Sequence, residues 1–286
     1  MKKLKFKRPS DEMLKRDAEI FHQVEFSGVL PSPEDARDFV ARSVNIFNLP
    51  DEYLAPDTEI LNQSSIGSCV AHACAQAMSH YEQSNAGNHN DYSRGYIYGN
   101  RRETDHQGEG MITREALKNL NHCGDVLYDD FPYNKKYPEV KKLIAENSEE
   151  LAKLAAEHKI IEYFRCYDEF QIKDAIMNNG GVIVCVPVYS DFGRDLHKTK
   201  TDKLTGHHAM LIVGWTKDNK WIVQNSWGAL WGYEGKLLMD FDYPANEYWA
   251  ISIETDNIKP KKKNIFKKIF NYTISLLQKI FSKKIR

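Results

Sequence analysis

The chain has 286 residues, of which 42% are hydrophobic and 28% are charged, and its formal net charge is −1. These values are ordinary for a soluble globular protein, and the length allows one large core or two modest ones. No run of about twenty uncharged apolar residues is present, so we expect no membrane-spanning helix.

Cysteine usage indicates a reducing, intracellular setting. The cysteines, five in number, stand at positions 69, 74, 123, 166 and 185 without CxxC or Cys/His metal spacing. This pattern argues against a structural zinc site and against a full disulfide framework. The first residues are basic but lack the apolar run of a secretory signal. We therefore expect a cytoplasmic protein that needs no metal ion and no cofactor.

An N-terminal extension is predicted over residues 1–48. One helix is expected after Ser10. A second is expected after Ser32, because Pro33 then takes the first helical position, where its missing N–H costs nothing. The main domain is expected over residues 49–256.

The first part of this domain, about residues 49–160, is predicted to be helical. We expect helices over residues 68–83, 91–102, 113–121 and 139–158. The last of these is rich in Lys, Glu, Ala and Leu, which favour an exposed helix.

Strands are predicted to dominate the second part, about residues 161–256. After a helix over residues 168–178, apolar and β-branched runs predict strands over residues 182–188, 209–215, 220–225, 235–240 and 247–254. Helices followed by strands indicate an α+β fold with two lobes, and a cleft between two lobes is a natural place for an active site.

Cys69 is the candidate nucleophile. It falls in the first turn of the helix expected over residues 68–83, where the helix dipole and unpaired N–H groups favour the thiolate. Gln63, six residues earlier, can direct its side-chain amide at a developing oxyanion beside the N–H of Cys69. A lone cysteine is more often a small buried core residue, but the partners described next outweigh that reading. His72 lies near Cys69 on the same helix, and we interpret it as structural.

Imidazole and amide partners follow in the strand-rich part. His208 precedes an apolar run, and His207 competes with it because one residue of register decides which side chain faces the cleft. We favour His208, since period-two alternation places it on the face of Met210. Asn225 ends a predicted strand and can fix the tautomer of the imidazole, and Trp227 can shield that hydrogen bond or simply pack in the core. A thiol, an imidazole and an amide together make an activated nucleophile.

These residues make the chain resemble the papain-like cysteine peptidases over about residues 49–255. The family's Gln and Cys six residues apart, its His–Ala strand and its Asn-Ser-Trp-Gly motif occur in family order, as Gln63 and Cys69, His208-Ala209 and Asn225-Ser226-Trp227-Gly228. The segment Leu230-Trp231-Gly232-Tyr233-Glu234-Gly235 is similar to the family's second Trp-Gly and its Gly-led strand.

The resemblance implies a helical left lobe, a β-barrel-like right lobe and an active site in the cleft between them. It implies a cysteine-type peptidase, in which the Cys69 thiolate attacks a peptide carbonyl and forms a thioester acyl-enzyme. His208 would protonate the leaving amine and then activate water. The residues that would line the bound peptide or protein substrate are Gly108, Gly110, Met111 and Trp227.

Three departures from the family pattern carry information. Ile66 and Val70 stand where the family usually has a cysteine and an aromatic residue. Losing that cysteine removes a common disulfide, which fits an intracellular member of bacterial or phage type. Residues 1–48 are too short for a full inhibitory propeptide, but we expect that they can still cover the cleft.

Residues 257–286 are predicted to form a basic amphipathic tail. They carry nine lysines, one arginine and no acid, so the other 256 residues carry a net charge of −11. Apolar side chains recur at helical spacing on one broad face, which is typical of a helix lying on an anionic membrane surface. Packing on the domain or on a partner protein fits the same pattern nearly as well. Nucleic-acid binding is not expected, because the acidic body repels phosphate.

Two other functions compete with the hydrolysis of peptide bonds. A catalytically silent papain-like module would bind peptides or act as a scaffold, and the intact set of Gln63, Cys69, His208 and Asn225 argues against it. An amidase acting on peptidoglycan-type amides would use the same nucleophile, so only substrate profiling separates it from a peptidase.

Overall fold

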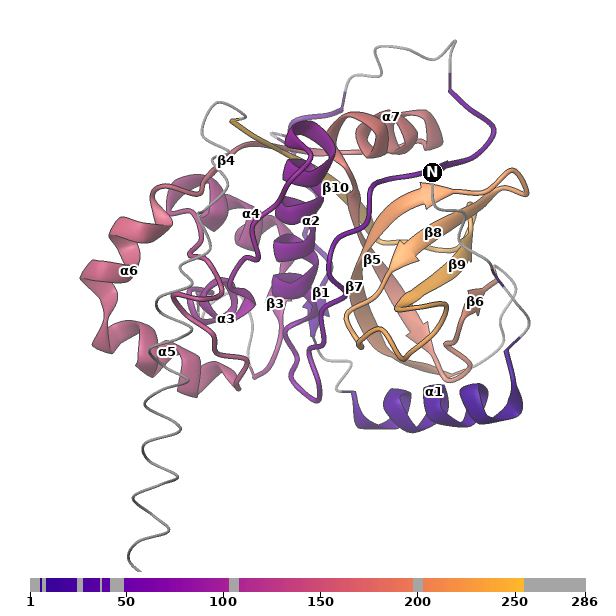
Figure 1. Ribbon diagram of the computed structural model, residues 1–286, viewed down its shortest axis with the longest axis horizontal. Helices are drawn as coiled ribbons and strands as arrows, with labels where there is room; N and C mark the ends of the chain where they lie inside the picture. Colours follow the sequence, from indigo (N-terminus) through magenta and orange to yellow (C-terminus); the bar gives the residue numbers. More distant parts are fainter. Residues whose placement is uncertain are drawn as a thin grey trace, which may run out of the picture.

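The computed structural model describes residues 6, 9–24, 28–36, 38–41, 49–102, 108–197 and 203–254. Figure 1 shows a helix-rich lobe on one side of helix α2 (Cys69–Ala86) and a strand-rich lobe on the other. The other helices of the first lobe are α3 (Arg94–Gly99), α4 (Thr113–His122), α5 (Tyr137–Glu146) and α6 (Ser148–Ala155). The chain therefore has the predicted α+β fold with two lobes.

The strand-rich lobe is built on an eight-stranded sheet. Its strands are β2 (Tyr53–Leu54), β4 (Ile160–Arg165), β5 (Val182–Tyr189), β6 (Asp195–Leu196), β7 (Leu204–Trp215), β8 (Lys220–Gln224), β9 (Lys236–Asp240) and β10 (Glu247–Ile253). They follow the order β4-β10-β5-β7-β8-β9-β6, and β2 pairs with β7 beside that path. Among the described strands this path stays open, so the lobe resembles a barrel without closing into one. Helix α7 (Glu169–Asn179) packs on β5, β7 and β10.

Alternation along β5 separates two apolar cores. Ile183 and Cys185 face the core around α2, whereas Val184 and Val186 face the core of the strand-rich lobe. Successive side chains of a strand point to opposite faces, so a strand between two cores is apolar at nearly every position. The same alternation along β7 orients the side chains next to the candidate imidazole.

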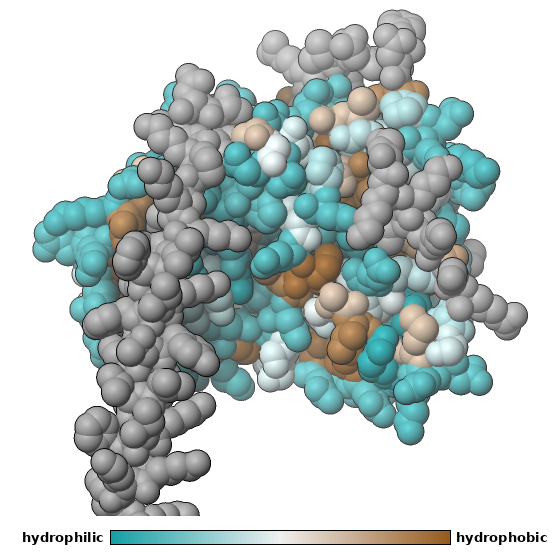
Figure 2. Space-filling view, in the orientation of Figure 1, coloured by the Kyte–Doolittle hydropathy of each residue, from teal (hydrophilic) through white to brown (hydrophobic). Residues whose placement is uncertain are grey.

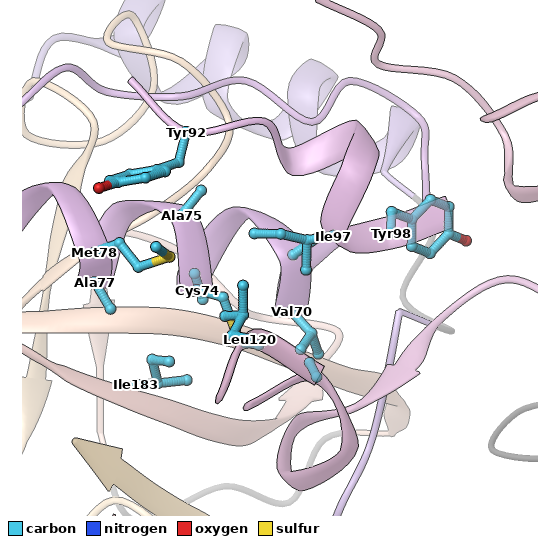
Figure 3. Close-up of a cluster of buried hydrophobic side chains, with 14 of the residues drawn as sticks. Val70, Cys74, Ala75, Ala77, Met78, Tyr92, Ile97, Tyr98, Leu120 and Ile183 are labelled. Carbon is cyan, nitrogen blue, oxygen red and sulfur yellow. The ribbon is translucent and has the colours of Figure 1, made fainter. Parts of the chain in front are cut away.

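Helix α2 lies in the middle of the first core. Figure 3 shows Val70, Cys74 and Met78 of this helix among the side chains of Ile97 and Leu120. Many of its other buried positions are alanines, which let neighbouring elements approach the helix closely. Because α2 is packed on nearly all sides, the core fixes the position of its first residue.

The N-terminal part contacts both lobes. Helix α1 (Asp11–Gln23) begins after Ser10, as predicted, and the Ser10 hydroxyl accepts a hydrogen bond from the first turn. Phe21 of α1 packs on the core of the strand-rich lobe. The short strand β1 (Val29–Leu30) then pairs in parallel with β3 (Met111–Ile112), beside the helix-rich lobe.

The helix predicted after Ser32 is wrong. Residues 31–36 are not helical, because Pro33 disfavours a helical backbone at the residue before it. The N–H of Ser32 donates instead to the Glu247 carboxylate at 3.2 Å, and its hydroxyl accepts a hydrogen bond from the N–H of Arg114 at 3.1 Å.

The single helix predicted over residues 139–158 is also wrong. Helix α5 ends at Glu146 and α6 begins at Ser148, and Asn147 between them has φ −131° and ψ 23°. The Asn147 side-chain amide donates to the Leu143 carbonyl at 3.1 Å, and such local bonds compete with helix propagation. The strand β4, which follows α6, has no counterpart among the predicted strands.

The predicted tail over residues 257–286 lies outside the described residues. Of the helices that the structure does describe, none is long and apolar enough to cross a membrane. Figure 2 shows one face of the molecule, which is mostly hydrophilic with apolar side chains gathered near its middle.

Candidate active site

Cys69 is the first residue of α2, directly after the N-cap residue Ser68. The residue is 1% exposed. Burial of the thiol raises its pKa to about 12, although N–H groups of Ala209, Val70 and Cys69 itself act to lower it. The thiolate expected from the sequence is therefore not the stable form in this arrangement, because burial outweighs the favourable helix N-terminus.

His208 of β7 meets Asn225, which follows β8. His208 Nε2 lies 2.8 Å from Asn225 Oδ1, and the N–H of Ser226 donates to the same oxygen at 2.8 Å. An amide oxygen only accepts hydrogen bonds, so Nε2 carries the proton and Nδ1 is the basic nitrogen. Burial lowers the pKa of His208 to about 4 despite the opposing effect of Asn225, so the imidazole is neutral near pH 7.

Alternation along β7 places His208 on the buried face that it shares with Met210. Its ring stacks on Trp227 with the centroids 5.0 Å apart, and Phe192 contacts it edge-on. His207 has the next position on β7 and is half-buried. Of the two candidates, His208 is therefore the one that reaches Asn225, and Trp227 lies behind its ring.

The two halves of the candidate site come from different lobes. Cys69 begins α2 of the helix-rich lobe, whereas His208 and Asn225 belong to the sheet. Ala209, next to His208, directs its N–H at the Cys69 sulfur, and α2 packs directly on β7. The structure thus brings together residues that are far apart in the sequence.

Gln63 is fully buried next to this group. Its Oε1 accepts a hydrogen bond from the Ser226 hydroxyl at 2.6 Å, and its Nε2 donates to the Ile66 carbonyl at 2.9 Å. These contacts fix which end of the amide is the donor. Each NH₂ group has two hydrogens, so Nε2 can donate to a second acceptor.

The predicted substrate-lining residues have different surroundings. Met111 belongs to β3, and its N–H donates to the Gly28 carbonyl at 3.1 Å. Gly110 has φ +115°, a conformation that favours glycine, and its carbonyl accepts a hydrogen bond from Arg101. Gly108 borders open space, since an added Cβ would meet no atom within 4 Å. Trp227, by contrast, is buried behind His208.

Gly28 covers the thiol. A Cβ added at Gly28 would stand 2.7 Å from the Cys69 sulfur and 3.2 Å from the Gly67 carbonyl oxygen, so only glycine fits against the sulfur. Residues 28–36 and 38–41, which we call the covering segment, pair first with β3 through β1 and then reach Arg165 of β4 through Phe39 and Ala41. The sequence expectation that residues 1–48 can cover the cleft agrees with this path, but Gly28 itself carries no sequence signal of such a role.

His72, interpreted from the sequence as structural, is buried and engaged with its own helix. Its Nδ1 lies 2.9 Å from the Ser68 carbonyl oxygen, and burial lowers its pKa to about 3. In the part of the chain that the structure describes, no group of three or more His, Cys, Asp or Glu side chains is arranged to hold a metal ion.

Comparison with known proteins gives the family. The sequence model of the papain family of cysteine proteases matches residues 52–252, which is more than half of the chain. The chain belongs to the papain family of cysteine proteases. It is thus a cysteine-type peptidase, which is a hydrolase.

Individual papain-family proteins resemble it over most of its length. An uncharacterized peptidase C1-like protein of Acanthamoeba polyphaga mimivirus is 27% identical over 221 residues, which are 69% of this chain and 71% of that protein. The solved structure of xylellain, a cysteine protease from Xylella fastidiosa, is 25% identical with a TM-score of 0.70 and covers 80% of this chain and 96% of its own. A procathepsin B from Trypanosoma congolense shares the fold, with 16% identity and a TM-score of 0.65. The match covers 83% of this chain and 89% of that chain.

Proposed function

We propose that the chain hydrolyses peptide bonds through Cys69, His208, Asn225 and Gln63. The observation that carries this proposal is the 2.8 Å contact between His208 Nε2 and Asn225 Oδ1, beside an Ala209 N–H that faces the Cys69 sulfur. With Asn225 Oδ1 as the acceptor of the Nε2 proton, Nδ1 would be the base for the thiol.

The reaction follows from these roles. His208 takes the thiol proton, and the Cys69 sulfur attacks the carbonyl carbon of the peptide bond. The side-chain amide of Gln63 and the N–H of Cys69 stabilise the oxyanion that forms. His208 then gives its proton to the leaving amine, which departs and leaves a thioester on Cys69. Water attacks the thioester carbonyl and gives a proton to His208; the C–S bond then breaks, the carboxylic acid leaves, and His208 returns the proton to the Cys69 sulfur.

The substrate strand takes the place of β1 on β3 in this proposal. Met111 would then donate its N–H to the substrate, as it now donates to the Gly28 carbonyl at 3.1 Å. Gly110 and Gly108 would border the same strand without side chains that obstruct it. Trp227 would act indirectly, because it stacks on His208 and excludes water from the bond to Asn225.

We infer that the described arrangement is a latent form. Gly28 lies against the sulfur, and the buried thiol, with a pKa of about 12, is a poor nucleophile near pH 7. Deletion of residues 1–48 should therefore raise activity. Equal activity of the deleted and full-length proteins would refute this inference.

Labelling and digestion test the proposed hydrolysis. An epoxide thiol probe should label the protein after the covering segment is removed or displaced, and Cys69→Ala should abolish both labelling and cleavage of a peptide library. The peptidase activity of Cys69→Ala should be at least about 10³-fold lower than that of the protein with Cys69 intact. Labelling without cleavage of any peptide would indicate an amidase with another substrate, and the absence of both would indicate a silent module.

For the tail, we infer attachment of a cytoplasmic protein to an anionic membrane surface. The support is the sequence pattern of residues 257–286, with nine lysines, one arginine and one apolar face. Five free cysteines agree with a reducing compartment. Co-sedimentation with anionic liposomes should require residues 258–286, and equal pelleting without them would exclude the membrane role.

A further inference from the structure

Gln76 is a buried amide in the middle of α2, on the side of the candidate active site. It follows Cys69 by seven residues, which is nearly two full helical turns, so the two side chains lie on the same face of the helix. Gln76 is 2% exposed, and the residues directly before and after it are alanines. Burial of an amide is costly unless its groups are hydrogen-bonded, and the mechanism proposed above gives Gln76 no task.

The side-chain amide of Gln76 reaches from α2 to Asn225 in the other lobe. Its Nε2 donates a hydrogen bond to the main-chain carbonyl of Asn225 at 3.3 Å. A carbonyl oxygen only accepts hydrogen bonds, so this contact fixes Nε2 as the end of the amide that faces Asn225. Gln76 Oε1 is buried and has no hydrogen-bond partner among the described residues. Such an unsatisfied buried group is costly, and proteins carry this kind of cost chiefly at functional sites.

The main chain of Asn225 determines where its side chain meets His208. Asn225 Oδ1 lies 2.8 Å from His208 Nε2 and accepts a hydrogen bond from the N–H of Ser226. Nδ2, at the other end of the same amide, has no hydrogen-bond partner in the part of the chain that the structure describes. The place of Oδ1 therefore follows the main chain. That main chain is held at its N–H by the Gly235 carbonyl at 2.9 Å and at its carbonyl by Gln76.

A second contact between α2 and the end of β8 lies one helical turn later. His80 Nε2 is 3.2 Å from Oε1 of Gln224, the residue before Asn225. Residues four apart on a helix share one face, so α2 contacts two consecutive residues at the end of β8 with the same face. The two contacts together fix how far the end of β8 lies along α2. Of the two, the contact of Gln76 is the one made to Asn225 itself.

These polar contacts couple the two halves of the candidate site. Cys69 and Gln76 belong to one helix, whereas His208 and Asn225 belong to the sheet. Apolar packing between helix and sheet is non-directional, whereas a hydrogen bond requires a particular distance and angle. A misplacement of about 1 Å in a catalytic group can lower a rate about 10²-fold, so a contact that fixes this distance matters for the reaction.

We propose that Gln76 is a positioning residue, which holds the main chain of Asn225 in place so that its side chain orients the His208 imidazole. The imidazole is thereby fixed relative to Cys69, which begins the same helix as Gln76. This inference rests on the proposed hydrolysis through Cys69. It adds to that reaction a residue that touches neither the substrate nor the reacting atoms.

Replacement of Gln76 by methionine tests this role. Gln76→Met keeps the length of the side chain but removes the donor. The full-length protein carries Gly28→Ala to displace the covering segment, and it cleaves a fluorogenic peptide chosen from the library digest. We expect kcat, counted per Cys69 labelled by the epoxide probe, to fall about tenfold with KM nearly unchanged. Gln83→Met, which changes a half-buried glutamine of the same helix that contacts His89, should leave kcat unchanged.

A second variant guards against a loss that comes only from poor folding. Gln76→Asn keeps a polar amide but is one methylene shorter, so it cannot reach the Asn225 carbonyl. It should give the same loss of kcat per labelled Cys69. Full activity per labelled Cys69 in both Gln76→Met and Gln76→Asn overturns the inference.

A double-mutant cycle shows whether Gln76 acts through Asn225. In the background of Asn225→Ala the side chain that Gln76 positions is absent, so Gln76→Met should change kcat/KM by less than about twofold. The alkylation rate of Cys69 by iodoacetamide gives the same comparison where cleavage is below detection. An equal tenfold loss with and without the Asn225 side chain would show that Gln76 acts elsewhere, and it overturns the inference.

The pH profile of kcat/KM gives a readout that the amount of folded protein does not affect. The hydrogen bond to Asn225 acts to raise the pKa of His208. Loosening this bond should therefore shift the limb of the profile that reports deprotonation of His208 to lower pH in Gln76→Met. An unshifted limb in Gln76→Met counts against the role of Gln76.

The remaining outcomes separate the inference from the function on which it rests. Cys69-dependent cleavage that Gln76→Met leaves unchanged overturns the role of Gln76 and leaves the proposed hydrolysis standing. No cleavage and no labelling of Cys69 by the epoxide probe overturn both.

Discussion

The candidate catalytic side chains and the segment that covers them meet at Cys69 but differ in how much of them is buried in the apolar cores. Cys69 begins α2, His208 lies within β7 and Asn225 follows β8, and the side chains of these elements are buried in two apolar cores. The covering segment buries only Val29 and Ala41 in these cores and is held mainly by main-chain pairing of β1 with β3 and by ion pairs of Asp38 with Arg114 and Arg165. Exposing the two cores requires global unfolding of the domain. Breaking a few polar contacts requires only local opening, which has a lower free energy than global unfolding. We therefore expect the segment to leave its place while the catalytic geometry persists.

Gly28→Ala should have the largest effect, because it should displace the covering segment and make Cys69 reactive. The added methyl group would stand 2.7 Å from the Cys69 sulfur, so the segment must move away. Uncovering lets the thiol pKa fall from about 12 toward its ordinary value of 9.0, which raises the thiolate fraction near pH 7 about a thousandfold. The rate of alkylation of Cys69 by iodoacetamide, mapped by mass spectrometry, should rise accordingly.

Two controls accompany this measurement. Gly193→Ala places a methyl group where the nearest atom is 3.7 Å away and should leave the rate unchanged. The exposed Cys123 gives an internal reference rate in every sample. A Cys69 that alkylates equally slowly in wild type and Gly28→Ala would show that Gly28 does not control access.

Acid should destabilise the domain, because three buried histidines are neutral in the folded state. Burial lowers the pKa of His72 to about 3 and those of His80 and His208 to about 4, all from an ordinary value of 6.5. The unfolded chain therefore binds more protons below pH 6.5, and the stability gained from neutral histidines is lost as the pH falls from 6.5 toward 4. One pH unit below 6.5 the combined loss is about 4 kcal/mol by this linkage.

Denaturant unfolding at pH 7.5 and 5.5 measures this loss. His80→Gln removes one of the three groups and should reduce the loss by about one third. His122→Gln, at an exposed position, should not change it. A free energy of unfolding that is the same at both pH values would contradict the buried, neutral state of these rings.

Asp38→Asn should release the covering segment through its ion pairs. Asp38 has a side chain that is 5% exposed and contacts both Arg114 and Arg165. Removing one partner of a buried ion pair costs about 3 kcal/mol, because the remaining charges stay unpaired. We expect faster proteolytic cleavage within the segment and higher peptidase activity. Glu34→Gln, an exposed change on the same segment, is the control, and an equal response of both variants would refute the role of Asp38.

Asp17→Asn should have the smallest effect on stability, and it should loosen the attachment of α1 to the strand-rich lobe. Asp17 forms a buried ion pair with Arg194 and accepts a hydrogen bond from the N–H of Gly232 at 3.2 Å. Asparagine keeps the acceptor but loses the charge, so we expect a loss of about 2 kcal/mol. Phe21 of α1 contacts the Trp227 ring, so partial release of α1 should alter tryptophan fluorescence. Glu19→Gln, exposed on the same helix, should leave both the stability and the fluorescence unchanged.

The sequence by itself determined the residue types of the site and most of the regular elements. Local patterns sufficed for α2 and β7, because apolar runs, caps and glycines act over a few neighbouring residues. The order of the motifs around Cys69, His208 and Asn225 also indicated the family and hence the two lobes. Alternation along β7 pointed to His208 rather than His207, because period-two geometry is a property of any strand.

Only the tertiary structure decided how distant segments act on one another. Pro33 keeps Ser32 out of a helix, but the partner of the Ser32 N–H is the Glu247 carboxylate, which lies 215 residues later in the chain. Burial raises the pKa of Cys69, and part of its surroundings is Gly28, which comes from a distant segment that continues into β1 beside β3. A helix N-terminus lowers the pKa of a thiol through local dipoles, but burial depends on what the rest of the chain places above it. Contacts between distant segments leave no periodic pattern in the sequence, and they fixed the covered state of this site.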